Sequence, residues 1–286
     1  MKFIKYFFQF IFIIFLLIIF KVIGLRLSRI LSSKLFSIIG PFFRSKKIID
    51  RNISFAFSES NNEFRKNTIH TMWKSYGKIF AEYAFIKYFR KIKSENFLEI
   101  KGQEILEKIK FSKEPVIFIS GHFDNFELMA MHIEKSGIDL AAIYRPLNNN
   151  FLNPLMENIR KKYICRKQIK KGISGTKEIL KHFKSGTSVA LMIDQRVSQG
   201  IKSLFFGNKA STTTIPAQFV KKFNCKIVPI YIGRKSNQKF TLEISEPFDF
   251  DNKETIEDIT LKLNRSLEKM IIRSPHQWIW SHNRWK

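Results

Sequence analysis

Short apolar runs typical of buried strands alternate with amphipathic helical stretches over most of this chain. The clearest run, at 115–120, reads Pro-Val-Ile-Phe-Ile-Ser and ends at a glycine. Further strands are expected at 140–144, 188–193, 226–232 and 240–244, and helices at 62–88, 125–136, 177–183, 216–223 and 254–272. This order predicts an α/β fold, a mixed central sheet flanked by helices with active groups at the carboxyl ends of strands. No repeat or second domain is visible, so residues 26–286 are expected to form one domain.

The first 25 residues predict a membrane anchor. Lys2 and Lys5 precede an uncharged run of 15 residues, 6–20, which as a helix would be about 22 Å long. Extension to Leu25 gives about 30 Å, the thickness of a hydrocarbon core, with Lys21 included. No small-residue cleavage site follows, which favours a retained anchor over a signal peptide. The helix either spans the bilayer or lies in one leaflet, and both placements fit the sequence.

The segment after the anchor is basic and amphipathic. Residues 27–48 are expected to lie on the membrane surface, interrupted at Gly40-Pro41. Positive charges next to a membrane helix favour the cytoplasmic side, so the body of the protein is expected there. The basic residues that follow the anchor are Arg26, Arg29, Lys34, Arg44, Lys46 and Lys47.

The chain carries 50 Lys and Arg against 24 Asp and Glu, a net charge of +26. Such an excess indicates an anionic partner, and part of it also fits the compositional drift that AT-rich coding produces, since Phe occurs 30 times. A content of 44% hydrophobic and 26% charged residues excludes a disordered chain and a polytopic membrane protein. Cys165 and Cys225 form neither a disulfide framework nor a zinc-ligand spacing.

His122 and Glu127 are the first candidate catalytic residues. His122 follows the strand expected at 115–120, and Glu127 falls in the first turn of the next helix, where Asp124 or Asn125 is expected to cap the helix. A carboxylate on one imidazole nitrogen fixes the tautomer and leaves the other nitrogen free as a base. Taken alone, such a pair also fits a structural hydrogen bond. No other His or Cys is spaced to complete a metal site.

Further motifs follow in a fixed order. Tyr144-Arg145-Pro146 and Asp194-Gln195 come after strands, and Arg160 opens a basic tract that extends to Lys184. Phe205-Phe206-Gly207 leads into the Thr212–Thr214 run, and the chain ends in Trp-Ile-Trp-Ser-His-Asn-Arg-Trp-Lys at 278–286. Taken together, this set resembles the bacterial lipid A late acyltransferases, the lauroyl/myristoyl acyltransferase family, over nearly the whole chain.

Two positions depart from the family pattern. The usual Asn-Pro after Tyr-Arg-Pro is Asn149-Asn150 here, with Asn153-Pro154 slightly later. Arg196 follows Asp-Gln where the family often carries an acidic or other polar residue. Both departures bear on the acceptor more than on the reaction.

The resemblance implies a glycerolipid-acyltransferase-like fold over residues 26–286 and transfer of a fatty acyl chain from acyl carrier protein to a hydroxyl of a lipid A precursor. It implies His122 as general base oriented by Glu127, and Arg160 as a ligand of the acceptor phosphate or of the oxyanion. Asp194 is expected to position Arg160 or an acceptor hydroxyl. The substrate-binding candidates are Arg145, Arg160, Asp194, Asn125 and Thr213. A purely structural role stays open as an alternative for three of these candidates: a strand-end salt bridge for Arg145, a helix cap for Asp194, and a helix cap for the threonine run.

No cofactor or metal is expected, with acyl-acyl carrier protein as co-substrate. The expected partners are acyl carrier protein, a phosphorylated glycolipid acceptor and anionic inner-membrane lipid, and no nucleic acid. The location implied is the inner membrane, with the catalytic domain on the cytoplasmic side. Two alternatives stay open: acylation of another membrane lipid, such as a lysophospholipid or a glycosylated phosphatidylinositol, and a non-catalytic basic protein that binds membranes or nucleic acid.

Overall fold

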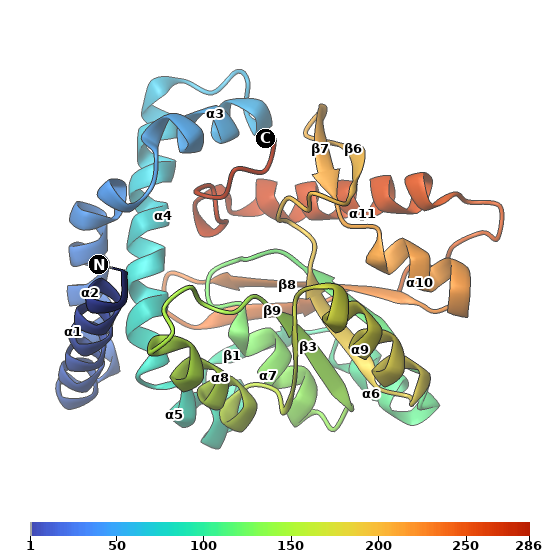
Figure 1. Ribbon diagram of the computed structural model, residues 1–286, viewed down its shortest axis with the longest axis horizontal. Coiled ribbons are helices and arrows are strands. Elements are labelled where there is room, and N and C mark those ends of the chain that lie inside the picture. Colours follow the sequence, from blue (N-terminus) through green and yellow to red (C-terminus); the bar gives the residue numbers. More distant parts are fainter. Residues whose placement is uncertain (1) are drawn as a thin grey trace.

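The computed structural model describes residues 2–286, and the side chains of all of these except Ile173. Met1, part of the expected anchor, lies outside the described residues. A seven-stranded sheet has the order β1-β9-β8-β2-β5-β3-β4 (Figure 1). Its strands are β1 (Leu98–Lys101), β2 (Ile117–Ser120), β3 (Leu140–Tyr144), β4 (Lys167–Lys170), β5 (Ser188–Met192), β8 (Ile227–Arg234) and β9 (Phe240–Ile244). β8 and β9 are antiparallel and every other neighbouring pair is parallel, which confirms the mixed α/β sheet.

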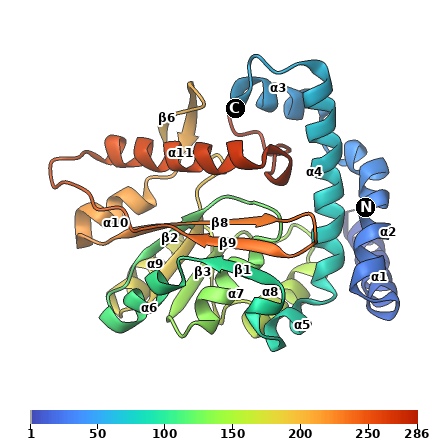
Figure 2. The same cartoon turned by 180° about the vertical axis from the view of Figure 1, so that it is seen from behind.

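Helices cover the sheet on both sides. In Figures 1 and 2, α6–α9 gather on one side, and α11 with the hairpin β6–β7 lies on the other. The bounds are α6 (Gln103–Ser112), α7 (Glu127–Lys135), α8 (Leu152–Tyr163), α9 (Ile173–Lys184), α10 (Ile215–Phe223), α11 (Ile256–Arg273), β6 (Ile201–Phe205), β7 (Asn208–Thr212) and the short 3-10 helix η2 (Pro275–Gln277). β8 is buried along nearly its whole length, as expected for a central strand covered on both faces.

Five α-helices precede the sheet: α1 (Lys2–Ile23), α2 (Leu25–Phe43), α3 (Lys46–Ala56), α4 (Asn62–Tyr83) and α5 (Ile86–Lys91), followed by the 3-10 helix η1 (Ser94–Asn96). Gly24 separates α1 from α2 with a φ of 82°, a left-handed conformation that favours glycine. α4 stands between the α1–α2 pair and the sheet (Figure 1). The first two helices therefore reach the rest of the molecule mainly through α4.

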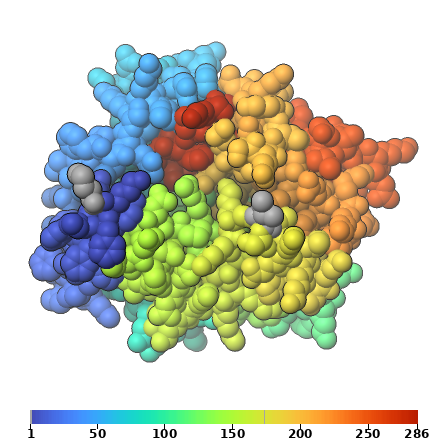
Figure 3. All heavy atoms as spheres, viewed as in Figure 1, coloured from blue at the N-terminus to red at the C-terminus, as the bar shows by residue number. Residues whose placement is uncertain are grey.

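α1 is, among the described residues, the one helix long and apolar enough to cross a membrane. At 22 residues it is about 33 Å long. It also lies against the body: the Asn149 amide donates to the Tyr6 carbonyl at 2.9 Å, the rings of Phe3 and Phe7 pack on Phe151, and Phe20 packs on Phe80. Figure 3 shows this helix, in dark blue, directly against the green surface of the body. The helix nevertheless exposes many large apolar side chains: Phe3, Ile4, Phe7, Phe8, Ile11, Phe12, Phe15, Ile18 and Val22.

α2 packs closely against α4. A Cβ at Gly77 of α4 would lie 2.2 Å from the Ser32 carbonyl oxygen, and one at Gly40 of α2 would lie 2.4 Å from the Trp73 ring. Glycine at these two positions therefore permits the close approach. The expected interruption at Gly40-Pro41 is wrong, because α2 continues through Pro41 to Phe43 and the chain leaves the helix at Arg44.

Several elements were not predicted. Four of them have sequences rich in charged residues, which show no regular alternation of apolar and polar positions: β1, α6, α8 and β4. β4 is also an edge strand, with one buried residue. The predicted helix at 62–88 divides into α4 and α5 at residues 84–85. The hairpin β6–β7 turns at Phe206 and Gly207, both with positive φ, which is the geometry of a two-residue type I′ loop.

Candidate active site

The parallel strands of the sheet bring their carboxyl ends to one edge. β2 and β5 are neighbours in a register that pairs Ser120 with Met192. His122 and Asp194 each follow two residues after those positions, so the register places them beside each other although they are 72 residues apart in the chain. β3, β4 and β8 end at the same edge, since they run parallel to β2 directly or through β5. The strand-end candidates His122 and Asp194 therefore meet at this edge, where the fold class predicts a site.

Asp194 holds His122 through two contacts. The imidazole Nδ1 lies 2.8 Å from Asp194 Oδ1, and the His122 backbone N–H donates to Oδ2 at 2.8 Å. Trp278 Nε1 donates to the same Oδ2 at 2.9 Å. Because the carboxylate only accepts, Nδ1 carries the ring proton and Nε2 keeps a free lone pair. The His122 side chain is 21% exposed, so a substrate can reach that ring.

Asp194 is fully buried, so its hydrogen-bond donors determine whether the carboxyl group is charged. Burial alone would raise the pKa of this carboxyl, but the charge of His122 and the hydrogen bonds from His122 and Trp278 lower the pKa below its ordinary value. A buried carboxylate without such partners would cost several kcal/mol. Asp194 is therefore ionised at neutral pH and ready to stabilise an imidazolium ion on His122.

Glu127 lies in a different contact. Its Oε1 accepts from Arg160 Nε at 2.9 Å and from Arg160 Nη2 at 2.8 Å, and also from the Tyr83 hydroxyl. Burial raises the pKa of that hydroxyl, with Glu127 adding to the effect. The expected contact of Glu127 with His122 is corrected: within residues 2–286, Asp194 occupies the imidazole and Glu127 joins α7 to α4 and α8. Asp194 correspondingly positions His122, and not Arg160 as expected.

Asn125 was expected to bind substrate, but the structure places it in the interior. Asn125 is buried at 2% exposure, and its side-chain amide donates to Glu82 Oε2 at 2.8 Å. It belongs to a packed polar network and not to an open binding surface. Thr213 is buried just before α10, and its hydroxyl accepts only weakly from the Ile215 N–H, at 3.4 Å. Thr214 occupies the N-cap position of α10 and makes no side-chain cap hydrogen bond, so the binding and helix-cap interpretations of the threonine run both stay predictions.

Arg145 lies on the exposed rim of the strand-end edge, next to a residue that the sequence did not single out. β3 and β4 pair Tyr144 with Lys170, so Arg145 and Lys171 directly follow paired positions. Burial and the positive charge of Arg145 lower the pKa of Lys171. Two cations that are held together in this way favour an anion between them. Lys171 was missed because β4 itself was missed.

The C-terminal segment contacts residues of the site through Trp278 and His282. Trp278 and Trp280 are buried as expected of core aromatics, but Trp278 also donates to Asp194. His282 Nε2 accepts the Arg196 N–H at 3.0 Å, and burial lowers the pKa of His282 to about 4, so this ring is neutral. The Arg284 guanidinium is buried and donates to the Ser211 carbonyl and the Thr212 hydroxyl, which fixes the end of β7.

Neither cysteine has the surroundings of a nucleophile. Burial raises the pKa of both Cys165 and Cys225 to about 12, which keeps them protonated at neutral pH. Over the described part of the chain, no group of three His, Cys, Asp or Glu side chains is arranged to hold a metal ion.

Comparisons with known proteins identify the family of the chain. The family model for the bacterial lipid A biosynthesis acyltransferases matches residues 1–286. The chain is 24% identical to the lipid A biosynthesis lauroyltransferase of Escherichia coli K12 over 258 residues, covering 85% of this chain and 79% of that protein. It is 22% identical to the palmitoleoyltransferase of the same strain, covering 86% and 80%, and 23% identical to a lipid A biosynthesis acyltransferase of Haemophilus influenzae, covering 85% and 78%. Because the family model matches the whole chain, the chain belongs to the bacterial lipid A biosynthesis acyltransferase family.

Proposed function

We propose that this protein transfers a fatty acyl chain from acyl carrier protein to a hydroxyl of a phosphorylated lipid A precursor, with His122 as the general base. Membership of the family supports acyl transfer in lipid A biosynthesis. The observation that carries the catalytic assignment is the His122–Asp194 pair, in which one ring nitrogen is held by a buried carboxylate and the other is free.

The chemistry follows from that pair. The acceptor hydroxyl gives its proton to Nε2 of His122 while its oxygen attacks the thioester carbonyl carbon. Asp194 stabilises the imidazolium ion that forms, as the carboxylate of a catalytic triad does. Collapse of the tetrahedral intermediate breaks the carbon–sulfur bond, and the imidazolium returns the proton to the leaving thiolate. The new ester forms with no acyl-enzyme, which fits the protonated state of both cysteines.

Arg160 supplies positive charge near this chemistry. Its guanidinium is mostly buried, held by Glu127 and Tyr83 and placed over the Tyr144 ring at 5.7 Å. Because Glu127 and Tyr83 hold the guanidinium through Nε and Nη2, its charge is fixed in place and the Nη1 group is the one that we expect to donate to an acceptor phosphate or to the oxyanion. In this proposal, Glu127 acts by orienting Arg160.

The exposed positive charge matches the two anionic substrates. Acyl carrier protein is acidic and the acceptor carries phosphate, so the rim cations Arg145 and Lys171 and the exposed lysines 161 and 162 have partners to attract. No cofactor is required, because the thioester already provides the driving force for transfer. The apolar α1 and the basic residues after it support attachment to the inner membrane with the catalytic domain on the cytoplasmic side.

The function is tested with purified protein, acyl-acyl carrier protein and a phosphorylated lipid A precursor. We expect acylated product by mass spectrometry, and His122→Ala is expected to lose at least about 100-fold in rate while staying folded. Transfer to a lysophospholipid in place of the lipid A precursor would assign a different acceptor. Lipid A from a strain without this protein is expected to lack one acyl chain, and an unchanged lipid A profile would contradict the proposal.

Asp194→Asn tests which carboxylate serves His122. We expect a loss of about 100-fold or more in kcat, since the amide cannot stabilise an imidazolium ion. The loss should be far from additive with His122→Ala, because both variants remove the same catalytic unit. Asp249→Asn, at a side chain that is 84% exposed, is the control and should keep full activity. Independent, multiplying effects of Asp194 and His122 would show that the pair does not act as one unit.

Arg160→Lys is expected to be severely impaired although charge is kept, because an ammonium cannot reproduce the two-pronged fork of a guanidinium. Lys161→Ala and Lys162→Ala are matched controls on the same helix, and both side chains are exposed. These controls should raise KM modestly, more so at low salt, and leave kcat nearly intact. Equal effects in steady-state assays at all three positions would mean that the helix acts only as diffuse charge.

Deletion of residues 1–25 is expected to release much of the protein from membranes, but not all of it. α2 keeps an exposed apolar face, which includes Leu27, Ile30, Leu31 and Ile38, beside exposed basic residues. The remaining affinity for anionic vesicles in a flotation assay should fall as salt is raised. Complete solubility at low salt would show that α2 does not contact the bilayer.

A further inference from the structure

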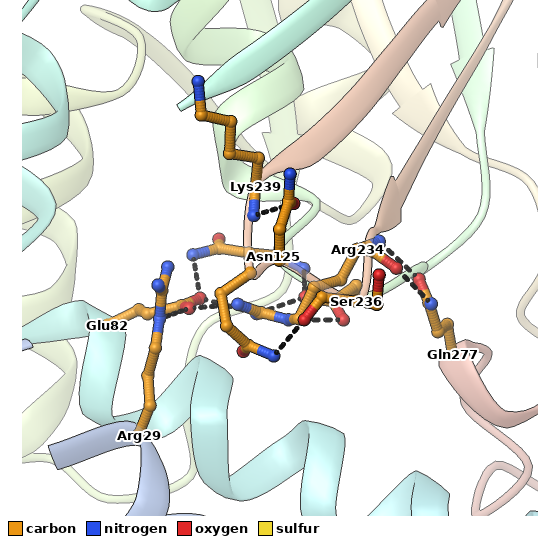
Figure 4. Close-up of polar contacts among 10 residues, drawn as sticks. Arg29, Glu82, Asn125, Arg234, Ser236, Lys239 and Gln277 are labelled. Atoms are coloured by element: carbon orange, nitrogen blue, oxygen red, sulfur yellow. Dashed lines mark hydrogen bonds and ion pairs between the residues drawn. The ribbon is translucent and has the colours of Figure 1, made fainter. Parts of the chain in front are cut away.

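Four charged side chains form a largely buried cluster of ion pairs between α2, α4, β8 and the turn that follows β2 (Figure 4). The Arg234 guanidinium contacts both carboxylates in a bidentate manner: Glu82 at 2.6 and 3.0 Å, and Asp124 at 2.5 and 3.1 Å. Arg29 Nε donates to Glu82 Oε1 at 2.6 Å. The Glu82 and Asp124 side chains are 0% exposed, Arg234 is 4% exposed and Arg29 is 12% exposed, so both carboxylates are removed from water and held by guanidinium groups. The half-buried Lys78 adds one further positive charge close to all four groups.

The turn that this cluster holds is the turn that carries His122. Asp124 lies two residues after His122 and has a φ of 34°, a left-handed backbone conformation that a residue other than glycine keeps only when its surroundings enforce it. Arg234 fixes the Asp124 carboxylate, and the Asp124 N–H donates to the Gln277 carbonyl at 2.8 Å. Asn125 ties the next residue of the turn to Glu82.

The cluster is also connected to Asp194 through the C-terminal residues Gln277 and Trp278. The Gln277 side chain bonds both the N–H and the carbonyl of Arg234, at 2.7 and 3.0 Å. The next residue, Trp278, donates to Asp194. Arg234 therefore fixes the turn that carries His122 and, through Gln277, the segment that holds its carboxylate partner.

Arg29 is the member of the cluster that comes from the N-terminal helical pair. Without it, Glu82 and Asp124 would share one guanidinium, and Glu82 Oε1 would lose one of its two charged donors, leaving the half-buried Lys78 as the other nearby cation. Uncompensated buried charge is strongly unfavourable, and the cheapest relief is movement of the most strained partner. That partner is the turn at Asp124.

We propose that Arg29 of α2 is a positioning residue for catalysis: it completes the Glu82–Arg234–Asp124 cluster and thereby holds His122 in register with Asp194. The α1–α2 pair is then part of the catalytic architecture as well as the membrane attachment. This inference rests on the proposed role of His122 as the base.

The test compares three full-length variants. Arg29→Met keeps an unbranched apolar stem and removes the charge, Arg29→Lys keeps the charge, and Arg26→Met is the control at an exposed position one turn away on α2. We expect Arg29→Met to lower kcat by about tenfold or more, with KM for both substrates within about twofold, because the fault lies in alignment and not in substrate binding. Arg29→Lys should recover much of the rate, and Arg26→Met should match the wild type.

Hydrogen–deuterium exchange provides a readout that does not depend on the reaction. The His122 N–H donates to Asp194, so a peptide spanning residues 117–128 should exchange faster in Arg29→Met and normally in Arg26→Met. If Arg29→Met does not fold, the Arg29→Lys variant is measured alone, with an intermediate loss in kcat and in protection expected. A normal kcat and normal exchange in the Arg29 variants, while His122→Ala is inactive, would overturn the inference. Full activity of His122→Ala would instead overturn the proposed function, whereas the exchange result would still report on the turn.

Discussion

The register between β2 and β5 is the constraint on which the rest of the site depends. Two parallel strands that pair Ser120 with Met192 must deliver the residues two positions later to the same point above the sheet edge. One of these is an imidazole and the other a carboxylate. A slip of one residue between the strands would turn every side chain to the opposite face, so burial of both strands in the core fixes the pair as firmly as it fixes the fold.

Around that pair, the protein places carboxylates where water cannot reach and gives each one its own donors. Asp194 receives His122 and Trp278, Glu127 receives Arg160 and Tyr83, and Glu82 receives Arg234 and Arg29. Hydrogen bonds to charged groups contribute about 1.5–3 kcal/mol each, which offsets a desolvation cost of several kcal/mol. Because each carboxylate already has its partners, the arrangement is rigid before substrate arrives, as catalysis by oriented charges requires.

The N-terminal helices connect this rigid site to the membrane. α1 exposes one apolar face and lies with the other against Phe151, which follows β3 by seven residues, while α2 enters the buried charge cluster through Arg29. An enzyme whose acceptor and product are lipids benefits from such a connection. The apolar helix α1 and the turn that carries His122 are parts of one packed unit.

The sequence by itself determined the fold class, the position of most central strands, the apolar N-terminal helix and the family. These follow from local patterns: apolar runs of strand length, glycine after a strand, and motifs in a fixed order. The same patterns failed for β1, α6, α8 and β4, whose burial depends on neighbours distant in sequence and leaves no clear period in the residues themselves. The interruption expected at Gly40-Pro41 was wrong for a related reason, since glycine there serves contact with Trp73 of another helix.

Which carboxylate meets His122 was decided only by the tertiary structure. Glu127 is five residues away in the chain and is drawn instead to the guanidinium of Arg160, whereas Asp194 is 72 residues away and is brought to the ring by strand pairing. Arg234 ends a strand parallel to β2, but that strand was predicted from the sequence to end at residue 232, and Arg234 was not singled out. Glu82 and Tyr83 end a helix and carry no such signal. Strand ends can be read from local sequence because burial patterns are local, but ion-pair partners cannot, because a charge selects its partner by distance in space and by the cost of leaving either charge alone in the core.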